Sequence, residues 1–208
     1  MNKYIRRFTI IVCLVIATVF GEAQINSKIK IHFLYGSKPL AKYKPKQQKW
    51  FGGKLGGHVG IETGTNQILN FVPNGKFHLL ANKKRHSKFI LSDTNSFYSI
   101  LGGNPTENKR LSITIPISLT QKQTLDSMQT NYLATTPFDY AFIGMRCGAA
   151  AYYLLSQINI VPSFSRRHTY LKIFYPKKLR KRLLKAAKIN YWNCTTNAGT
   201  KERNWEKD

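Results

Sequence analysis

The sequence predicts an α+β fold in which an antiparallel sheet packs against helices. Two kinds of periodicity predict it: apolar and polar residues alternate in some segments, as in half-buried strands, and apolar residues recur three or four positions apart in others, as in helices. The composition of the 208 residues agrees, because 42% hydrophobic and 12% aromatic residues are ordinary for a globular protein. It excludes collagen-like, coiled-coil and wholly disordered chains. At this length we expect one domain, which we place at residues 24–208.

Alternating segments and turn residues mark the strands. Gly64 begins a short turn between two alternating runs, which predicts a hairpin. Pro116 has no backbone N–H, so the strand that contains it, or the end of that strand, is expected at a sheet edge. Residues 81–109 are polar and are expected to be irregular. The expected strands are 29–35, 58–62, 67–72, 77–80 and 111–117.

Helical spacing and end signals mark the helices. Thr120 and Gln123 have the spacing of a capping box at the start of one helix. A second helix is expected to carry Cys147 in its first turn, and its small residues 148–151 predict that it lies close against the sheet. Pro176 suits the first turn of the last helix. The expected helices are 120–133, 144–158 and 176–189.

The first 23 residues are typical of a secretory signal peptide. Three basic residues precede the apolar run 8–20, and the small residues Gly21 and Ala23 occupy the positions that a signal peptidase reads. The apolar run is shorter than the ~20 residues needed to span a bilayer. We therefore expect cleavage between Ala23 and Gln24 and export to a periplasmic or extracellular location.

The charge predicts a surface that meets anions. The formal net charge is +24, from 33 Lys and Arg against 9 Asp and Glu. Nucleic acid is not an expected partner, because an exported protein rarely meets it. The helix 176–189 is basic and amphipathic, so it either contacts an anionic membrane or cell-wall polymer or docks its Leu/Ala stripe on the core; the narrow stripe favours docking.

Three residues together suggest nucleophilic catalysis. Cys147 is expected at a helix N-terminus, where unpaired N–H groups and the helix dipole stabilise a thiolate. His58 opens one strand of the hairpin, and the register that Gly64 sets makes Asn70 its diagonal neighbour on the same face. An imidazole beside a thiol completes a nucleophile–base pair, and an amide oxygen fixes the imidazole tautomer. Taken singly, each residue also has an ordinary packing or surface interpretation.

The segments that carry these residues resemble a known superfamily. They read GGHVGIETGTNQILNFVPNG and DYAFIGMRCGAAAYYLL. They are similar to the circularly permuted NlpC-type papain-like proteins, which include YiiX-like bacterial proteins and lecithin:retinol acyltransferase-like enzymes. His58 matches the family's strand-opening His, Asn70 matches a polar residue twelve positions on, and Cys147 matches the nucleophile. Asn70 stands where His or Glu is more common.

The resemblance covers about residues 29–160 and carries several implications. It implies a permuted papain-like fold, a thiol hydrolase mechanism, no metal and no organic cofactor. The oxyanion hole is then expected to include the backbone N–H of Cys147. Tyr140 is a candidate second donor, although it also reads as an ordinary core aromatic. The residues themselves, apart from the resemblance, mark the Gly- and Lys-rich segment 42–57, which leads into His58. Trp50 and Lys54 are candidates for a loop that borders the substrate, or else Trp50 pins a passive loop onto the core.

The expected function is an exported, amidase- or peptidase-like thiol hydrolase that cleaves an amide or ester bond, with cell-wall material as the favoured substrate. One alternative is an acyl-lipid hydrolase or acyltransferase. Another is a non-enzymatic, cationic envelope-binding protein in which Cys147 and Cys194 form a disulfide.

Overall fold

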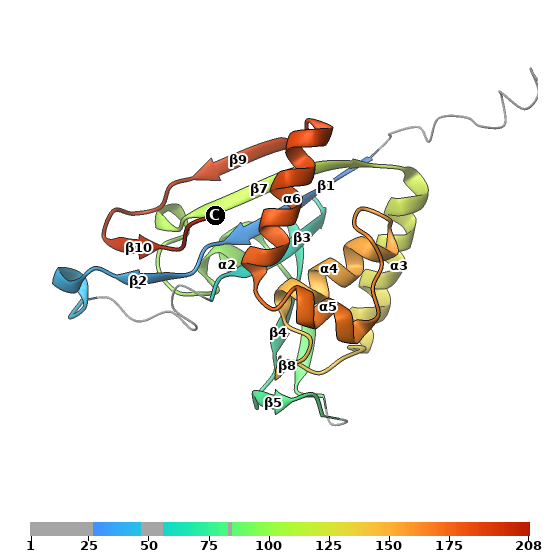
Figure 1. The fold of residues 1–208 in the computed structure, drawn as a ribbon, viewed down its shortest axis with the longest axis horizontal. Coiled ribbons are helices and arrows are strands. Elements are labelled where there is room, and N and C mark those ends of the chain that lie inside the picture. The colour runs from blue at the N-terminus through green and yellow to red at the C-terminus, as the bar shows by residue number, and fades with distance from the viewer. Residues whose placement is uncertain (1–26, 47–55, 83–84) are drawn as a thin grey trace, which may run out of the picture.

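The structure is a computed structural model that describes residues 27–46, 56–82 and 85–208. Its centre is a six-stranded sheet in the order β6-β4-β3-β1-β7-β9, in which each pair of neighbours is antiparallel (Figure 1). The α+β expectation with an antiparallel sheet is therefore confirmed. The six strands are β1 (Ser27–Leu34), β3 (His58–Gly64), β4 (Gln67–Pro73), β6 (Ser87–Ser92), β7 (Arg110–Ile117) and β9 (Asn193–Asn197).

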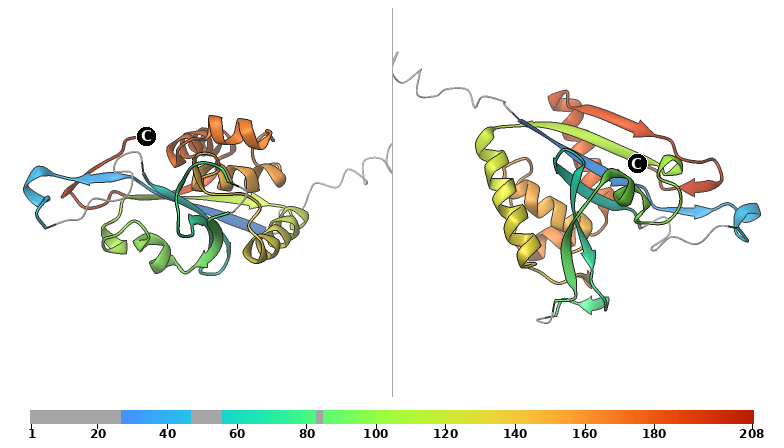
Figure 2. Two further views of the ribbon diagram at one scale, coloured as in Figure 1. Left: turned by 90° about the horizontal axis from the view of Figure 1, so that it is seen from below. Right: turned by 180° about the vertical axis from the view of Figure 1, so that it is seen from behind.

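Two pairs of short strands lie outside this sheet. β2 (Ser37–Pro39) pairs antiparallel with β10 (Arg203–Trp205), and β5 (His78–Leu80) pairs parallel with β8 (Ala141–Ile143). The β5–β8 pair lies at the lower end of the molecule in Figure 1 and again in the right-hand view of Figure 2.

The helices cover both faces of the sheet. In the left-hand view of Figure 2, α4, α5 and α6 lie over one face and α2 lies on the other. α3 packs against α4 and β6. Two short 3-10 helices, η1 (Ala41–Tyr43) and η3 (Pro105–Glu107), occur in connections. The described α-helices are α2 (Thr94–Ser99), α3 (Leu119–Ala134), α4 (Cys147–Gln157), α5 (Arg166–Lys172) and α6 (Pro176–Asn190).

The alternation read from the sequence explains the two buried layers. Alternate residues of β1, such as Ile31 and Phe33, join one core with α4 and α6, because successive strand residues point to opposite faces. Leu34, which follows Phe33 and points to the other face, belongs to a second, smaller cluster with Phe97 and Tyr98 of α2. The central strands are thus covered on both faces near the hairpin.

Two detailed expectations about the strands are confirmed. Gly60 pairs with Asn70 across the β3–β4 hairpin, as predicted. The turn itself differs, because Gly64 is the last residue of β3 and pairs with Gln67, and a register shift between Glu62 and Gly64 replaces the expected three-residue turn 64–66. β7 pairs with β1 along its whole length but with β9 only as far as Thr114. Pro116 therefore lies beyond the end of the β9 ladder, on an edge, as its missing N–H requires.

Some local expectations were wrong. Residues 81–109 are not irregular, because they contain β6, α2 and η3. The α3 capping box is Ser118 with Gln121 rather than Thr120 with Gln123: the Ser118 hydroxyl accepts the Gln121 N–H, and the Gln121 side chain accepts the Ser118 N–H. Both pairs fit the same sequence pattern, and the structure uses the earlier one.

The basic helix docks on the core. Leu179, Leu183 and Ala187 of α6 are buried, as the docking interpretation expects. Arg180 is fully buried as well, and its guanidinium forms ion pairs at 2.6 Å with Glu206 and with Asp208. These pairs hold the last residues of the chain against α6. None of the helices within the described ranges combines the length and the apolar character that crossing a membrane requires.

Candidate active site

Cys147 is the first residue of α4, three residues later than the expected start of this helix. The connection from β8 is tight: Tyr140 and Met145 form a bridge, and a Cβ on Gly144 would lie 2.9 Å from that of Ala141. The helix therefore cannot begin at Gly144. The thiol lies beside the unpaired N–H groups of the first helical turn, and the residue is only 4% exposed.

Gly148 places the Cys147 turn against α6. A Cβ at this position would lie 3.0 Å from the Pro176 backbone nitrogen, so α4 and α6 approach each other as closely as a glycine permits. The small residues at the start of α4 were expected to allow close contact with the sheet; at Gly148 they allow close contact with another helix.

His58 and Asn70 meet as the hairpin register requires. The His58 Nε2 and the Asn70 Oδ1 are 3.0 Å apart, and both residues are buried. The Asn70 amide group donates to the Ile68 carbonyl at 3.1 Å and to the Ser92 hydroxyl at 3.0 Å. Because its NH2 group is used there, its oxygen faces the imidazole. The network therefore assigns the hydrogen to Nε2 of His58 and leaves Nδ1 for Cys147.

The structure joins the thiol to this pair. Burial is the largest influence on both groups: it raises the pKa of Cys147 and lowers the pKa of His58. Their mutual charge attraction and hydrogen bond outweigh burial, so that the pKa of Cys147 is lowered below its usual value and the pKa of His58 is raised above its own. The two shifts bring the pKa of the thiol and the pKa of the imidazole closer together, which makes proton transfer from Cys147 to His58 easier than between two isolated groups.

Tyr140 is more than a core aromatic. Its ring stacks on Phe71 with centroids 5.2 Å apart. Its hydroxyl hydrogen-bonds the Cys147 sulfur, and the Cys147 backbone N–H donates to the Tyr140 oxygen. Burial and the neighbouring thiolate raise the pKa of Tyr140 well above its usual value, so the hydroxyl stays protonated. Both candidate oxyanion donors therefore lie beside the sulfur.

The sequence analysis missed two neighbours of the site. Phe97 of α2 lies against His58, with ring centroids 5.5 Å apart. Arg146, the residue before the nucleophile, lowers the pKa of Cys147 through its charge. Its guanidinium donates to the Phe174 carbonyl and stacks on that ring at 4.1 Å. Arg146 could have been found from the sequence, because it directly precedes Cys147. Phe97 could not, because it lies in a segment that was expected to be irregular.

Two further expectations concern a substrate loop and a disulfide. Trp50 and Lys54, the expected substrate-loop residues, lie outside the described residues. Cys147 and Cys194 are both free thiols, and Cys194 is exposed on β9 beside Ile113. The alternative that requires a Cys147–Cys194 disulfide therefore disagrees with the structure.

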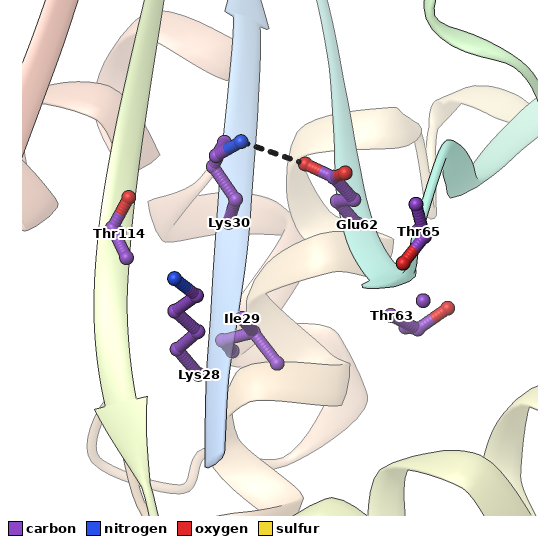
Figure 3. A pocket seen from close by; sticks show the side chains of 8 residues that line it. Lys28, Ile29, Lys30, Glu62, Thr63, Thr65 and Thr114 are labelled. Carbon is purple, nitrogen blue, oxygen red and sulfur yellow. Dashed lines mark ion pairs between the residues drawn. The ribbon is translucent and has the colours of Figure 1, made fainter.

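Three surface pockets in the described regions are lined by residues other than His58, Asn70, Tyr140 and Cys147. One, of about 310 Å³, lies on the exposed side of β1 and β3, where Lys30 and Glu62 form an ion pair at 3.2 Å (Figure 3). Among the described residues, no group of three or more His, Cys, Asp or Glu side chains is arranged to hold a metal ion.

Comparisons with known proteins identified no relative of this chain. Searches with protein-family models, with curated proteins and with solved structures each found no match to this chain.

Proposed function

We propose that the protein is a thiol hydrolase that cleaves an amide or ester bond through an acyl-enzyme on Cys147. One observation carries the proposal: a thiol at a helix N-terminus contacts an imidazole whose far nitrogen is held by a buried amide. Each member is placed by a different element, namely α4, β3 and β4. A buried Cys that only fills space in the core needs no oriented imidazole beside it and no fixed imidazole tautomer.

The reaction follows from the positions of the atoms. The Cys147 sulfur attacks the substrate carbonyl carbon and forms a tetrahedral intermediate, whose oxyanion replaces the Tyr140 oxygen as acceptor of the Cys147 N–H and replaces the sulfur as acceptor of the Tyr140 hydroxyl. His58 gives its Nδ1 proton to the leaving amine or alcohol as the bond to the carbonyl breaks. It then takes a proton from water, and the resulting hydroxide releases the acyl group as a carboxylic acid and restores the thiolate. Asn70 keeps the imidazole in place throughout.

We also propose that the fold is the permuted papain-like one. Two features support it: the chain order His58, Asn70, Cys147, and the packing of the Cys-bearing α4 against β3 and β4. The apolar N-terminal segment and the resemblance of the site segments favour an exported enzyme that acts on cell-wall peptides ahead of acyl lipids. The outward lysines of α6 remain available to contact an anionic surface, as the sequence suggested.

The acyl-enzyme is directly testable with p-nitrophenyl acetate. We expect a burst of p-nitrophenol and an added acetyl group on Cys147, located by peptide mass spectrometry. Cys147→Ala and His58→Ala should abolish both signals. The matched control is Cys194→Ser, which removes the other described thiol and should leave the burst unchanged. An acetyl group found only on lysines, or a burst that survives in Cys147→Ala, would contradict the proposal.

A further inference from the structure

The β5–β8 pair carries an unusual concentration of exposed apolar side chains, which we call the apolar ribbon. Five of the thirteen exposed large hydrophobic residues of the described chain belong to it. They come from segments more than sixty residues apart in the sequence and are brought together by the parallel pairing of β5 with β8. These residues are Phe77 (42% exposed), Leu79 (67%), Leu80 (62%), Phe142 (40%) and Ile143 (42%).

The ribbon is exposed on both of its faces. Leu79 and Leu80 are adjacent in a strand, so their side chains point to opposite sides, and each is more than 60% exposed. At Leu79 and Leu80, neither face of β5 is therefore covered by the rest of the fold. Figure 1 and the right-hand view of Figure 2 both show β5 protruding at one end of the molecule. The shape is a convex tip rather than a groove.

A buried carboxylate fixes the base of this tip. Asp139 is 3% exposed, and its oxygens accept from the backbone N–H groups of Asn82 and His86 at 2.9 Å each. It also bonds the His78 Nδ1 at 2.5 Å, and the other nitrogen of His78 lies 2.9 Å from the His86 ring. The connection that follows β5 is thus tied to the segment that leads into β8. The fold holds the apolar side chains out in a defined place.

The sequence segments that carry the ribbon are basic. Within the sequence segments 74–92 and 133–147 the only acidic residue is Asp139, which is buried and hydrogen-bonded. Lys76 and Arg85 are exposed on either side of β5 in the chain. The basic residues of the two segments are Lys76, Lys83, Lys84, Arg85, Lys88 and Arg146.

We propose that the apolar ribbon docks the protein on an anionic lipid bilayer. Apolar side chains held at a protruding tip enter the boundary between head groups and acyl chains, and the cations of these basic segments meet the lipid phosphates. A bilayer closes around a tip that is exposed on both faces, whereas a flat protein partner covers only one. β8 ends four residues before Cys147, so docking places the candidate nucleophile close to the lipid surface.

Vesicle sedimentation tests the proposal without any turnover. The chain from Gln24 onward, which contains every described helix and strand, is mixed with vesicles of phosphatidylglycerol and phosphatidylcholine in equal amounts. We expect binding that weakens in high salt and on pure phosphatidylcholine. Leu79→Ser combined with Leu80→Ser should weaken binding to the anionic vesicles by about tenfold or more. Leu119→Ser combined with Leu171→Ser removes two exposed leucines elsewhere and should bind like the parent.

Three outcomes would overturn the proposal. The first is a parent that does not sediment with anionic vesicles. The second is a ribbon variant that binds as tightly as the parent, which would assign the contact to another surface such as α6. A parent that is a dimer in solution and becomes monomeric in the ribbon variant would make the ribbon a self-association surface. Unchanged melting temperatures in both double variants establish that each has kept its fold. Because binding is measured without a reaction, its failure leaves the hydrolase proposal unaffected.

Discussion

Gly60→Ala is a sharp test of how the hairpin, α2 and the candidate site fit together. A Cβ at Gly60 would lie 2.4 Å from a methyl group of Ile68 and 2.7 Å from the ring of Phe97. Gly60 pairs with Asn70 on one side and with His32 on the other, so the strand cannot move away without breaking both ladders. The clash must therefore displace side chains that are fully buried.

The magnitude follows from two opposing effects. Alanine restricts the unfolded chain more than glycine does, which stabilises the fold by ~0.4–1 kcal/mol. Overpacking in a filled core costs ~1–3 kcal/mol, so the clash prevails. The net cost is then up to about 2.6 kcal/mol, which for a chain of this size lowers the melting temperature by up to roughly 10 °C. Because Phe97 lies on His58, we also expect slower acetylation of Cys147 by p-nitrophenyl acetate.

Thermal unfolding followed by circular dichroism measures the first effect, and the p-nitrophenol burst measures the second. Gly64→Ala is the matched control at the end of the same strand. Its new Cβ would lie 3.3 Å from the flexible end of the Gln67 side chain, so stability should change by less than about 0.5 kcal/mol. If Gly60→Ala melts at the same temperature as the parent, the close packing of β3 against α2 is refuted.

Three further predictions concern single side chains. Asn70→Ala should reduce the rate of Cys147 acetylation less than His58→Ala does, because an orienting amide transfers no proton; equal losses at equal stability would contradict its assigned role. Tyr140→Phe should slow acetylation by roughly 10²-fold if its hydroxyl is an oxyanion donor, and an unchanged burst rate would remove it from that role. Arg180→Leu leaves the carboxylates of Glu206 and Asp208 without their buried partner. The free energy of unfolding, measured in urea, should fall by about 3–5 kcal/mol. A fall below about 1 kcal/mol would show that these ion pairs contribute little.

Much of the fold was readable from the sequence because its central strands are amphipathic. The alternation in β1, β3, β4 and β7 reflects a real core on one face, and the turn at Gly64 fixes the register that joins His58 to Asn70. The position of Cys147 near a helix start was also readable, since small residues and apolar spacing follow it. These signals are local, and each depends on only a few neighbouring residues.

The missed elements depend on distant contacts. β6 is an edge strand with several polar residues, and only its pairing with β4 makes it regular. α2 is six residues long, too short for a clear periodic pattern, and is capped by the Asp93 side chain. The role of Arg180 could not be read either. It lies in a run of basic residues, and its partners Glu206 and Asp208 are more than twenty residues away.

The most direct test of the central claim is a pH titration of the Cys147 thiolate by its ultraviolet absorbance. The signal is the difference between Cys194→Ser and the same protein carrying Cys147→Ala. Because the charge and hydrogen bond of His58, the Tyr140 hydrogen bond and the Arg146 charge together outweigh burial and lower the pKa of Cys147, the thiolate should form at a lower pH than that of an ordinary thiol. In His58→Ala the transition should move upward. A thiolate that appears only at or above the ordinary thiol pKa of about 8.5 would contradict the account.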